Sequence, residues 1–207
     1  YGVATPKNNG WSPLGPSDWQ SISYNPGIGR VNVVAEHPTN DQILYAGSPS
    51  GGIWKSTNGG INWENLNDDF PTLGVSGIAI DHSDPQTIYI ATGDKDGTDT
   101  YSIGVVKSSD GGQTWNNTGL SHSLTQFLVC RELKMHPSNP NILIVATNDG
   151  LFKTDDAGVT WTESQDGSFR DVEFHPTDPT IVYASDDRMW RSTDSGNTFT
   201  VVSNGLP

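Results

Sequence analysis

The sequence predicts an all-β protein, and more specifically a β-propeller built of four-stranded blades. A composition of 17% charged residues, with 23 glycines and 13 prolines in 207 residues, is typical of turn-rich β proteins and not of helical ones. One unit, with a fixed order of short apolar runs and turns, recurs four times. Units of roughly 40–50 residues that hold four short strands each are the sequence signature of propeller blades.

The first unit shows this order most clearly. It consists of an apolar run at 31–35, the turn His37-Pro38-Thr39-Asn40, a β-rich run at 43–47 and a third run at 52–55. Proline fixes φ in the turn, and Asn or Asp closes it with its own side chain. His136 and His175 open the same turn in the third and fourth units. We expect these histidines to serve the turn and not a zinc site, because repetition places them on separate blades.

The units divide the chain into four expected blades, at residues 30–70, 71–121, 122–164 and 165–207. The end of the last unit resembles the link before the second, so we expect a further blade to follow it. Residues 1–29 are expected to form an N-terminal segment with a ring-closing outer strand, because residues 11–14 resemble the end of a unit. Inserted loops, chiefly 93–104 and 116–128, explain the unequal unit lengths, and no segment has a helical period.

A glycine turn that ends in an aromatic residue closes each unit. In the second unit it reads Ser108-Ser109-Asp110-Gly111-Gly112-Gln113-Thr114-Trp115. The Asp side chain can accept backbone N–H groups within the turn, glycine supplies a positive φ, and the aromatic ring packs beneath. We therefore expect a structural role for the acid or amide and the aromatic residue of all four copies, which are Asn58, Trp63, Asp110, Trp115, Asp156, Trp161, Asp194 and Phe199.

This motif, S/T-x-D/N-x-G-x-T-W, resembles the Asp-box, or BNR repeat, of sialidases, sortilin-type ectodomains and xyloglucanases. The four copies occupy equivalent places in residues 30–202. The resemblance implies a propeller of six or more blades, with the box as the hairpin between the third and fourth strands, so this chain would be part of a larger propeller. The sequence at residues 29–32, 45–56 and 92–94 looks closest to that of secreted multi-blade proteins of Bacteroidetes type. This resemblance implies a secreted or cell-surface location.

Charge excludes several classes of partner. The formal net charge is -13, and the 11 basic residues are scattered along the chain. Neither nucleic acid nor an anionic membrane surface suits such a protein, because both need clustered Lys and Arg. No apolar run reaches transmembrane length. The single cysteine, Cys130, allows no internal disulfide and is expected to be a buried apolar position.

One loop is a candidate cation site. Asp94, Asp96 and Asp99 bring three carboxylates into six residues with two flanking glycines. Ca²⁺ binds several oxygen ligands on a turning backbone, so we expect a possible calcium site here. The loop lacks the distal bidentate Glu of an EF-hand, and the alternative is a solvated acidic loop at one face of a blade.

The resemblance also suggests glycoside hydrolysis as an activity. Sialidase chemistry would need an Arg-Ile-Pro signature, which residues 29–32 do not provide. In xyloglucanases an Asp precedes the Gly-Gly of the first blade, but residues 48–52 carry no carboxylate. Since hydrolysis of a glycosidic bond takes two carboxylates, the sequence leaves an enzymatic activity uncertain and leans against it.

The function that the sequence favours is a non-catalytic secreted or cell-surface module that binds glycan or protein. The loop aromatics Trp19, Tyr24 and Tyr101 are candidates for such contacts, whereas we expect Trp54, Val106, Phe152 and Trp190, at equivalent strand positions, to be core. The alternative is a fragment of a xyloglucanase- or sialidase-like hydrolase with catalytic residues partly outside this chain. A third reading, a propeller that resembles photosystem assembly factors, lacks the expected arginine patch. The remaining blades, on the same or a partner chain, are expected partners.

Overall fold

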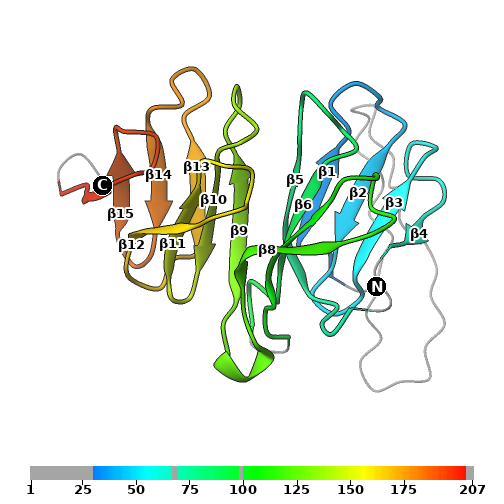
Figure 1. Cartoon of the computed structure of the whole chain (residues 1–207), viewed down its shortest axis with the longest axis horizontal. Helices are drawn as coiled ribbons and strands as arrows, with labels where there is room; N and C mark the ends of the chain where they lie inside the picture. Colours follow the sequence, from blue (N-terminus) through cyan, green and yellow to red (C-terminus); the bar gives the residue numbers. More distant parts are fainter. Residues whose placement is uncertain (1–29, 67–69, 98–99, 204–207) are drawn as a thin grey trace, which may run out of the picture. The chain divides into compact units, whose positions relative to one another are not determined.

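The computed structural model describes residues 30–66, 70–97 and 100–203. These residues form four separate antiparallel sheets of four strands each, in chain order (Figure 1). We call the sheets blades 1 to 4. Their strands are β1 (Val33–Glu36), β2 (Leu44–Gly47), β3 (Ile53–Ser56) and β4 (Glu64–Asn65); β5 (Val75–Ile80), β6 (Ile88–Thr92), β7 (Gly104–Ser108) and β8 (Asn116–Ser121); β9 (Cys130–Met135), β10 (Leu143–Thr147), β11 (Gly150–Thr154) and β12 (Thr162–Gln165); and β13 (Asp171–Phe174), β14 (Val182–Ser185), β15 (Met189–Ser192) and β16 (Thr200–Val201).

Within each blade the strands are paired in sequence order, and the first strands of neighbouring blades lie beside one another. The prediction of an all-β fold of four-stranded blades is therefore confirmed for the described residues. One detail differs, because residues 116–121 form β8 and not part of an inserted loop. The expected outer strand in residues 1–29 lies outside the described residues. No helix in the described part of the chain has the length and apolar character needed to span a membrane.

The core lies between blades and not within them. Three buried apolar clusters join blade 1 to blade 2, blade 2 to blade 3, and blade 3 to blade 4. Strands β6 and β10 are buried on both faces because a blade covers each side. Strand β14 alternates between buried and half-buried residues, since only the face toward blade 3 is covered by a described blade.

Trp54 departs from the prediction that its position is core. Its side chain is 37% exposed, whereas Val106 and Trp190 at equivalent positions are 2% and 8% exposed. Trp54 pairs with Ala46 and Asn65, on the face of blade 1 that points away from blade 2. The prediction was wrong because burial at this position depends on a preceding blade, and none lies among the described residues.

In blades 2, 3 and 4 the glycine corner of the hairpin fits closely against the preceding blade. Gly196 has φ of +83°, and a Cβ added there would collide with Ile144 Cδ1 in blade 3. Gly60 has nearly the same φ, +87°, but its added Cβ would meet only Leu44 and Trp63, at ordinary contact distances of 3.6 and 3.7 Å. A comparison of alanine substitutions at the two glycines therefore distinguishes the energetic cost of backbone strain from the cost of packing against the preceding blade.

We predict that Gly196→Ala destabilises the protein more than Gly60→Ala. The left-handed backbone costs both variants about 1–2 kcal/mol. Overpacking against Ile144 adds about 1–3 kcal/mol for Gly196→Ala alone. Chemical denaturation of both variants measures the difference, and equal losses of unfolding free energy would show that the blade interface tolerates a methyl group.

Candidate functional site

The two ends of the blades differ in character. In a four-stranded antiparallel meander, the 1–2 and 3–4 connections lie at one end and the 2–3 and 4–1 connections at the other. We call them the box end and the loop end. The box end carries the repeated turns and hairpins that the sequence analysis identified. The loop end carries connections of unequal length, which is where binding residues on a rigid scaffold usually lie.

Each hairpin at the box end is closed by one hydroxyl and one Asx side chain. The hydroxyl that ends the third strand accepts the N–H of the glycine four residues later, at 2.8–3.0 Å, and donates to the Asx Oδ1 two residues later, at 2.7–3.0 Å. The same Oδ1 also accepts the backbone N–H of the residue four positions after the Asx, at 2.8–2.9 Å. The residues are Ser56 with Asn58, Ser108 with Asp110, Thr154 with Asp156, and Ser192 with Asp194.

The choice of Asp or Asn follows from a second hydroxyl. In blades 2, 3 and 4 the other carboxylate oxygen accepts a bond from Thr114, Thr160 or Thr198 at 2.6–2.7 Å. Blade 1 has Asn62 in place of the threonine, and there Asn58 provides the one oxygen that the hairpin still uses. This coupled change supports a structural role for the Asx residues of the four boxes, which are Asn58, Asp110, Asp156 and Asp194.

The hydrogen bonds also lower the pKa values of the hairpin carboxyls. The bonds from the Thr114 hydroxyl and N–H and from Ser108 lower the pKa of Asp110 to about 2. The equivalent bonds from Thr160 and Thr154 lower the pKa of Asp156 to about 2. For Asp194, burial raises the pKa, but its hydrogen bonds outweigh that effect and bring it to about 2.

The histidines of the 1–2 turns have a similar local role. Nδ1 of His136 accepts the N–H groups of Ser138 and Asn139, at 3.2 and 3.1 Å, and His37 and His175 accept equivalent bonds. In blade 2, Asp81 takes over this role by accepting the N–H groups of Ser83 and Asp84. The side chains therefore close separate turns, as expected.

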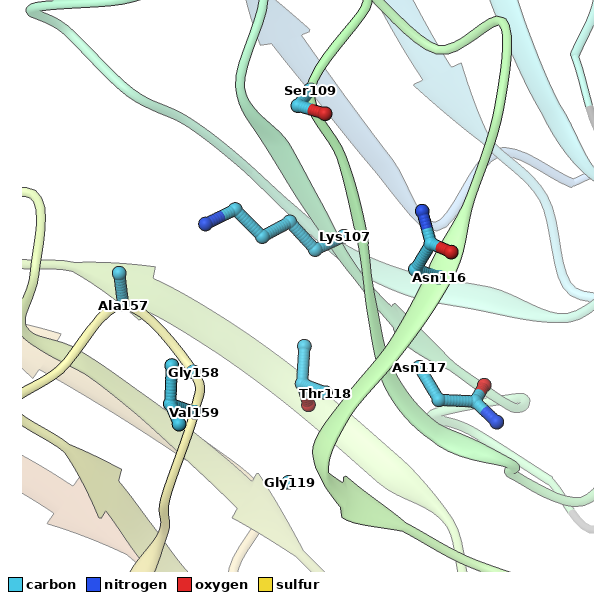
Figure 2. A pocket seen from close by; sticks show the side chains of 9 residues that line it. All are labelled: Lys107, Ser109, Asn116, Asn117, Thr118, Gly119, Ala157, Gly158 and Val159. Atoms are coloured by element: carbon cyan, nitrogen blue, oxygen red, sulfur yellow. The ribbon is translucent and has the colours of Figure 1, made fainter.

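A groove of about 340 Å³ lies between blade 2 and the hairpin of blade 3 (Figure 2). It is lined on one side by Lys107 and residues 116–119, and on the other by Ala157, Gly158 and Val159. Lys107 Nζ lies 5.1 Å from the centroid of the Tyr89 ring, and Tyr89 Oη donates to Ala157 O at 3.0 Å. The groove is thus one instance of the contact that each blade makes with the next, and its position in the repeat argues against a dedicated ligand site.

The connections at the loop end are hydrogen-bonded to one another across blades. Thr100 Oγ1 donates to Pro49 O at 2.7 Å, and Ser102 N donates to Leu128 O at 2.7 Å. Val129 N donates to Asn148 Oδ1 at 2.8 Å, which ties the link before β9 to the 2–3 connection of blade 3. These bonds tie the described connections of the loop end to one another.

Two aromatic rings are presented at the loop end. Tyr101 and Phe127 form an edge-to-face pair with ring centroids 5.0 Å apart. Phe127 is 61% exposed and has φ of +56°, a left-handed conformation that is strained for a bulky residue. Asn148 Nδ2 donates to the Phe127 carbonyl at 3.2 Å, and a capping box between Ser123 and Gln126 fixes the 3-10 turn η1 (Leu124–Gln126) before it.

The proposed calcium loop is organised differently from the expectation. Asp94 is fully buried, its N–H donates to Thr100 O at 3.0 Å, and its Oδ1 accepts the N–H of Asp96 at 3.3 Å. Asp99 lies outside the described residues. Among those that are described, no group of three or more His, Cys, Asp or Glu residues is arranged to hold a metal ion. The calcium site stays a prediction, and Asp94 has a clear part in closing the loop.

Charged residues gather where the first strands of blades 3 and 4 meet. Lys134 Nζ lies 3.3 Å from a carboxylate oxygen of Glu132 and 2.7 Å from one of Glu173. Burial raises the pKa of Glu132, against the effect of Lys134 and Lys95. Lys95 Nζ, from the acidic loop, is 3.9 Å from Glu132. The site therefore contains two carboxylates on different blades with one ammonium between them.

Of these residues only Tyr101 was predicted from the sequence, whereas Phe127, Glu132, Lys134 and Glu173 were not. A signal for the charged residues was present, because β9 carries Arg131, Glu132 and Lys134 where the first strands of blades 1 and 2 are mostly apolar. Cys130, by contrast, is fully buried as expected, and burial raises the pKa of its thiol to about 11. It is therefore not a nucleophile.

Comparisons with known proteins agree with this architecture. No family model matches the chain. A xyloglucanase of Hypocrea jecorina (strain QM6a) is 28% identical over 151 residues, which are 67% of this chain and 18% of that protein. An ancestral GH74 enzyme superposes with a TM-score of 0.70 at 20% identity, covering 90% of this chain and 25% of that one. The GH74 xyloglucanase of Xanthomonas campestris gives 0.68 at 21%, covering 92% and 32%.

These likenesses establish the fold. The four sheets are blades of a β-propeller, and the described residues form part of one, as predicted. The matches to four curated xyloglucanases cover most of this chain. They span 18% or less of the length of each xyloglucanase.

We predict that Asp110→Ala lowers the melting temperature by a few degrees at pH 7, whereas Asp110→Asn has a smaller effect because Asn58 shows that an amide can close the hairpin. The folded pKa of Asp110 is about 2, below its ordinary value of 3.8, so its contribution is complete above pH 4 and is lost between about pH 4 and 2. Thermal melts from pH 7 to 2 measure this, and a difference between wild type and Asp110→Ala that persists at pH 2 would contradict it.

Proposed function

We propose that this chain is part of a secreted or cell-surface propeller of the Asp-box class that binds a polysaccharide of the xyloglucan type at its loop end. The observation that carries the proposal is the edge-to-face pair of Tyr101, which is half-buried, and Phe127, which is 61% exposed. Sugar rings stack on aromatic faces, and an aromatic ring held in place before binding loses little conformational entropy when the ligand arrives.

The strain at Phe127 supports a binding role. A left-handed backbone at a bulky residue costs on the order of 1–3 kcal/mol and persists only where its surroundings enforce it. Here the bonds from Asn148 and the capping box enforce it, and the result is a ring that is 61% exposed. The left-handed conformation ends the turn η1, since the Phe127 N–H bonds to Leu124 O, and it leaves the ring available for contact with a ligand.

The relatives support xyloglucan as the class of ligand. The sequence matches are to proteins named xyloglucanases, and one structural neighbour is an auxiliary nutrient binding protein from Bacteroides thetaiotaomicron, with a TM-score of 0.61 at 16% identity. A neutral, extended polysaccharide also suits this chain, because its net charge of -13 disfavours anionic glycans.

A glycoside hydrolase fragment is the second candidate. The observation in its favour is the pair Glu132 and Glu173 on different blades, of which Glu132 has a raised pKa, as a general acid requires. Against it stands the ammonium of Lys134 between them, which holds both carboxylates in ion pairs. We therefore favour binding without hydrolysis for the described residues.

We predict that Tyr101→Ala and Phe127→Ala each weaken binding of xyloglucan oligosaccharides by at least about fivefold, as expected for loss of an aromatic anchor. Titration calorimetry measures the affinity. Val159→Ala is the matched control, because Val159 is 71% exposed but lies at the box end. Equal affinities of Phe127→Ala and the control would contradict the proposed binding surface. Binding of a protein but not of the glycan would show that the ligand is a protein.

We also predict that the chain releases no reducing sugar from xyloglucan, because Lys134 occupies the space between the two carboxylates. A reducing-end assay over hours measures this. Release that disappears in Glu132→Gln but persists in Glu163→Gln, a change on the outer strand β12, would instead establish the hydrolase candidate.

A further inference from the structure

A pocket of about 360 Å³ lies on the side of blade 2 that faces blade 1. Its lining comes from β7 and β8 with their flanking residues, and from the link between the two blades. We call it the blade 2 pocket. It shares only Asn117 with the groove at the hairpin of blade 3, and Figure 2 shows the Asn117 side chain pointing away from that groove. The two cavities are therefore separate.

The pocket lies where blade 2 lacks an aromatic ring that the other blades have. Val106, on β7, pairs with Asn117 of the fourth strand. The residues that hold the same place in blades 1, 3 and 4 are Trp54, Phe152 and Trp190. In blades 3 and 4 these rings pack against the apolar cluster shared with the preceding blade. The smaller valine of blade 2 leaves a space that a ring can occupy.

Two aromatic side chains form an apolar corner of the pocket. The centroids of the Phe70 and Trp115 rings are 6.0 Å apart, and the ring planes are inclined at 84°. Trp115 Nε1 donates to Leu66 O at 3.3 Å, which fixes the orientation of the indole. The corner thus offers aromatic surface that is in place before a ligand binds, and such surface loses little conformational entropy on binding.

The rest of the lining adds polar groups without a formal charge. They are the Asn117 amide, the Ser121 hydroxyl and the His122 imidazole. Burial lowers the pKa of His122 below its ordinary value of 6.5, although the charge of Asp149 opposes this effect, so the neutral imidazole predominates at pH 7. Asn117 and Ser121 are exposed, so the pocket is open to solvent on their side.

Size and chemistry together select the occupant. A volume of about 360 Å³ lies near the lower end of the range for small-molecule sites, about 300–1,000 Å³, and suits one ring better than a chain. Aromatic faces beside groups that both donate and accept hydrogen bonds fit a sugar, whose ring has apolar C–H faces and a belt of hydroxyls. An aromatic side chain of another protein would leave the three polar groups of the pocket without a partner.

We propose that the blade 2 pocket binds one neutral sugar ring, as a branch of a polysaccharide presents. One face of the ring packs on Phe70 or Trp115, and its hydroxyls exchange hydrogen bonds with Asn117 and His122. The proposal rests on the proposed function for its class of ligand, a neutral glycan, but the site is distinct from the aromatic pair at the loop end.

NMR titration of the chain with the methyl glycosides of xylose, glucose and galactose tests the proposal. The indole N–H signal of Trp115, identified by its loss in Trp115→Phe, reports on the pocket. We expect at least one glycoside to shift this signal saturably with a Kd in the millimolar range, since a single ring makes few contacts. In Val106→Phe the shift should disappear, because the new side chain places in the pocket the ring that Phe152 provides in blade 3.

A matched pair of asparagine variants keeps the test independent of that core substitution. Asn117→Ala should raise the Kd at least about threefold by removing a hydrogen bond to the sugar. Asn116→Ala should leave the Kd unchanged, because Asn116 is also exposed on β8 but does not line the pocket. The Trp115 signal reports on the pocket, whereas calorimetry of Phe127→Ala reports on the loop end, so either proposal can fail without the other.

A Kd that Asn117→Ala or a folded Val106→Phe leaves unchanged overturns the proposal. The absence of a saturable shift with all three glycosides overturns it as well. A shift with p-cresol, an analogue of the tyrosine side chain, in the same samples would then show that the pocket takes an aromatic side chain of a partner protein.

Discussion

The fold depends on the hydroxyl that ends the third strand of every blade. Ser108, for example, accepts the N–H of Gly112 and donates to Asp110, so one side chain fixes both the direction and the corner of the hairpin. That corner is the surface that covers the preceding blade. Because the apolar clusters lie between blades, closing the hairpin and burying the core are parts of one event. A free hairpin would leave residues such as Tyr89 and Ile144 exposed.

The sequence predicts this part of the structure well because the interactions are local. Every partner of the hairpin hydroxyl lies within four residues of it, so the pattern of residues contains the contact. Whether one face of a blade is buried depends on a neighbouring blade that is distant in sequence. The prediction that Trp54 is core was wrong for this reason. Trp54 has the same strand position as Val106 and Trp190, but a neighbouring blade decides whether that position is core. Residues 116–121 have weak strand propensity, and pairing with β7 makes them a strand.

The candidate site could be predicted only in part, because its geometry comes from bonds between distant residues. Thr100 and Pro49 are 51 positions apart, and Asn148 and Phe127 are 21 apart. No pattern in the loops shows that these bonds form, so the sequence identified Tyr101 as a loop aromatic but gave no reason to pair it with Phe127. The same limit applies to Asp94, whose acidic neighbours suggested an open ligand loop although its own side chain is buried.

The two ends of the blades therefore have different structural roles. At the box end the hairpins of blades 2, 3 and 4 each accept a hydrogen bond from the preceding blade and so hold one blade to the next. At the loop end the connections hold one another, and this rigidity is what can keep Phe127 in a strained, exposed conformation. Strain of that kind must be offset by stability elsewhere in the chain. The repeated hairpins lie at the opposite end of the blades, and the interfaces that they close contribute stability of that kind.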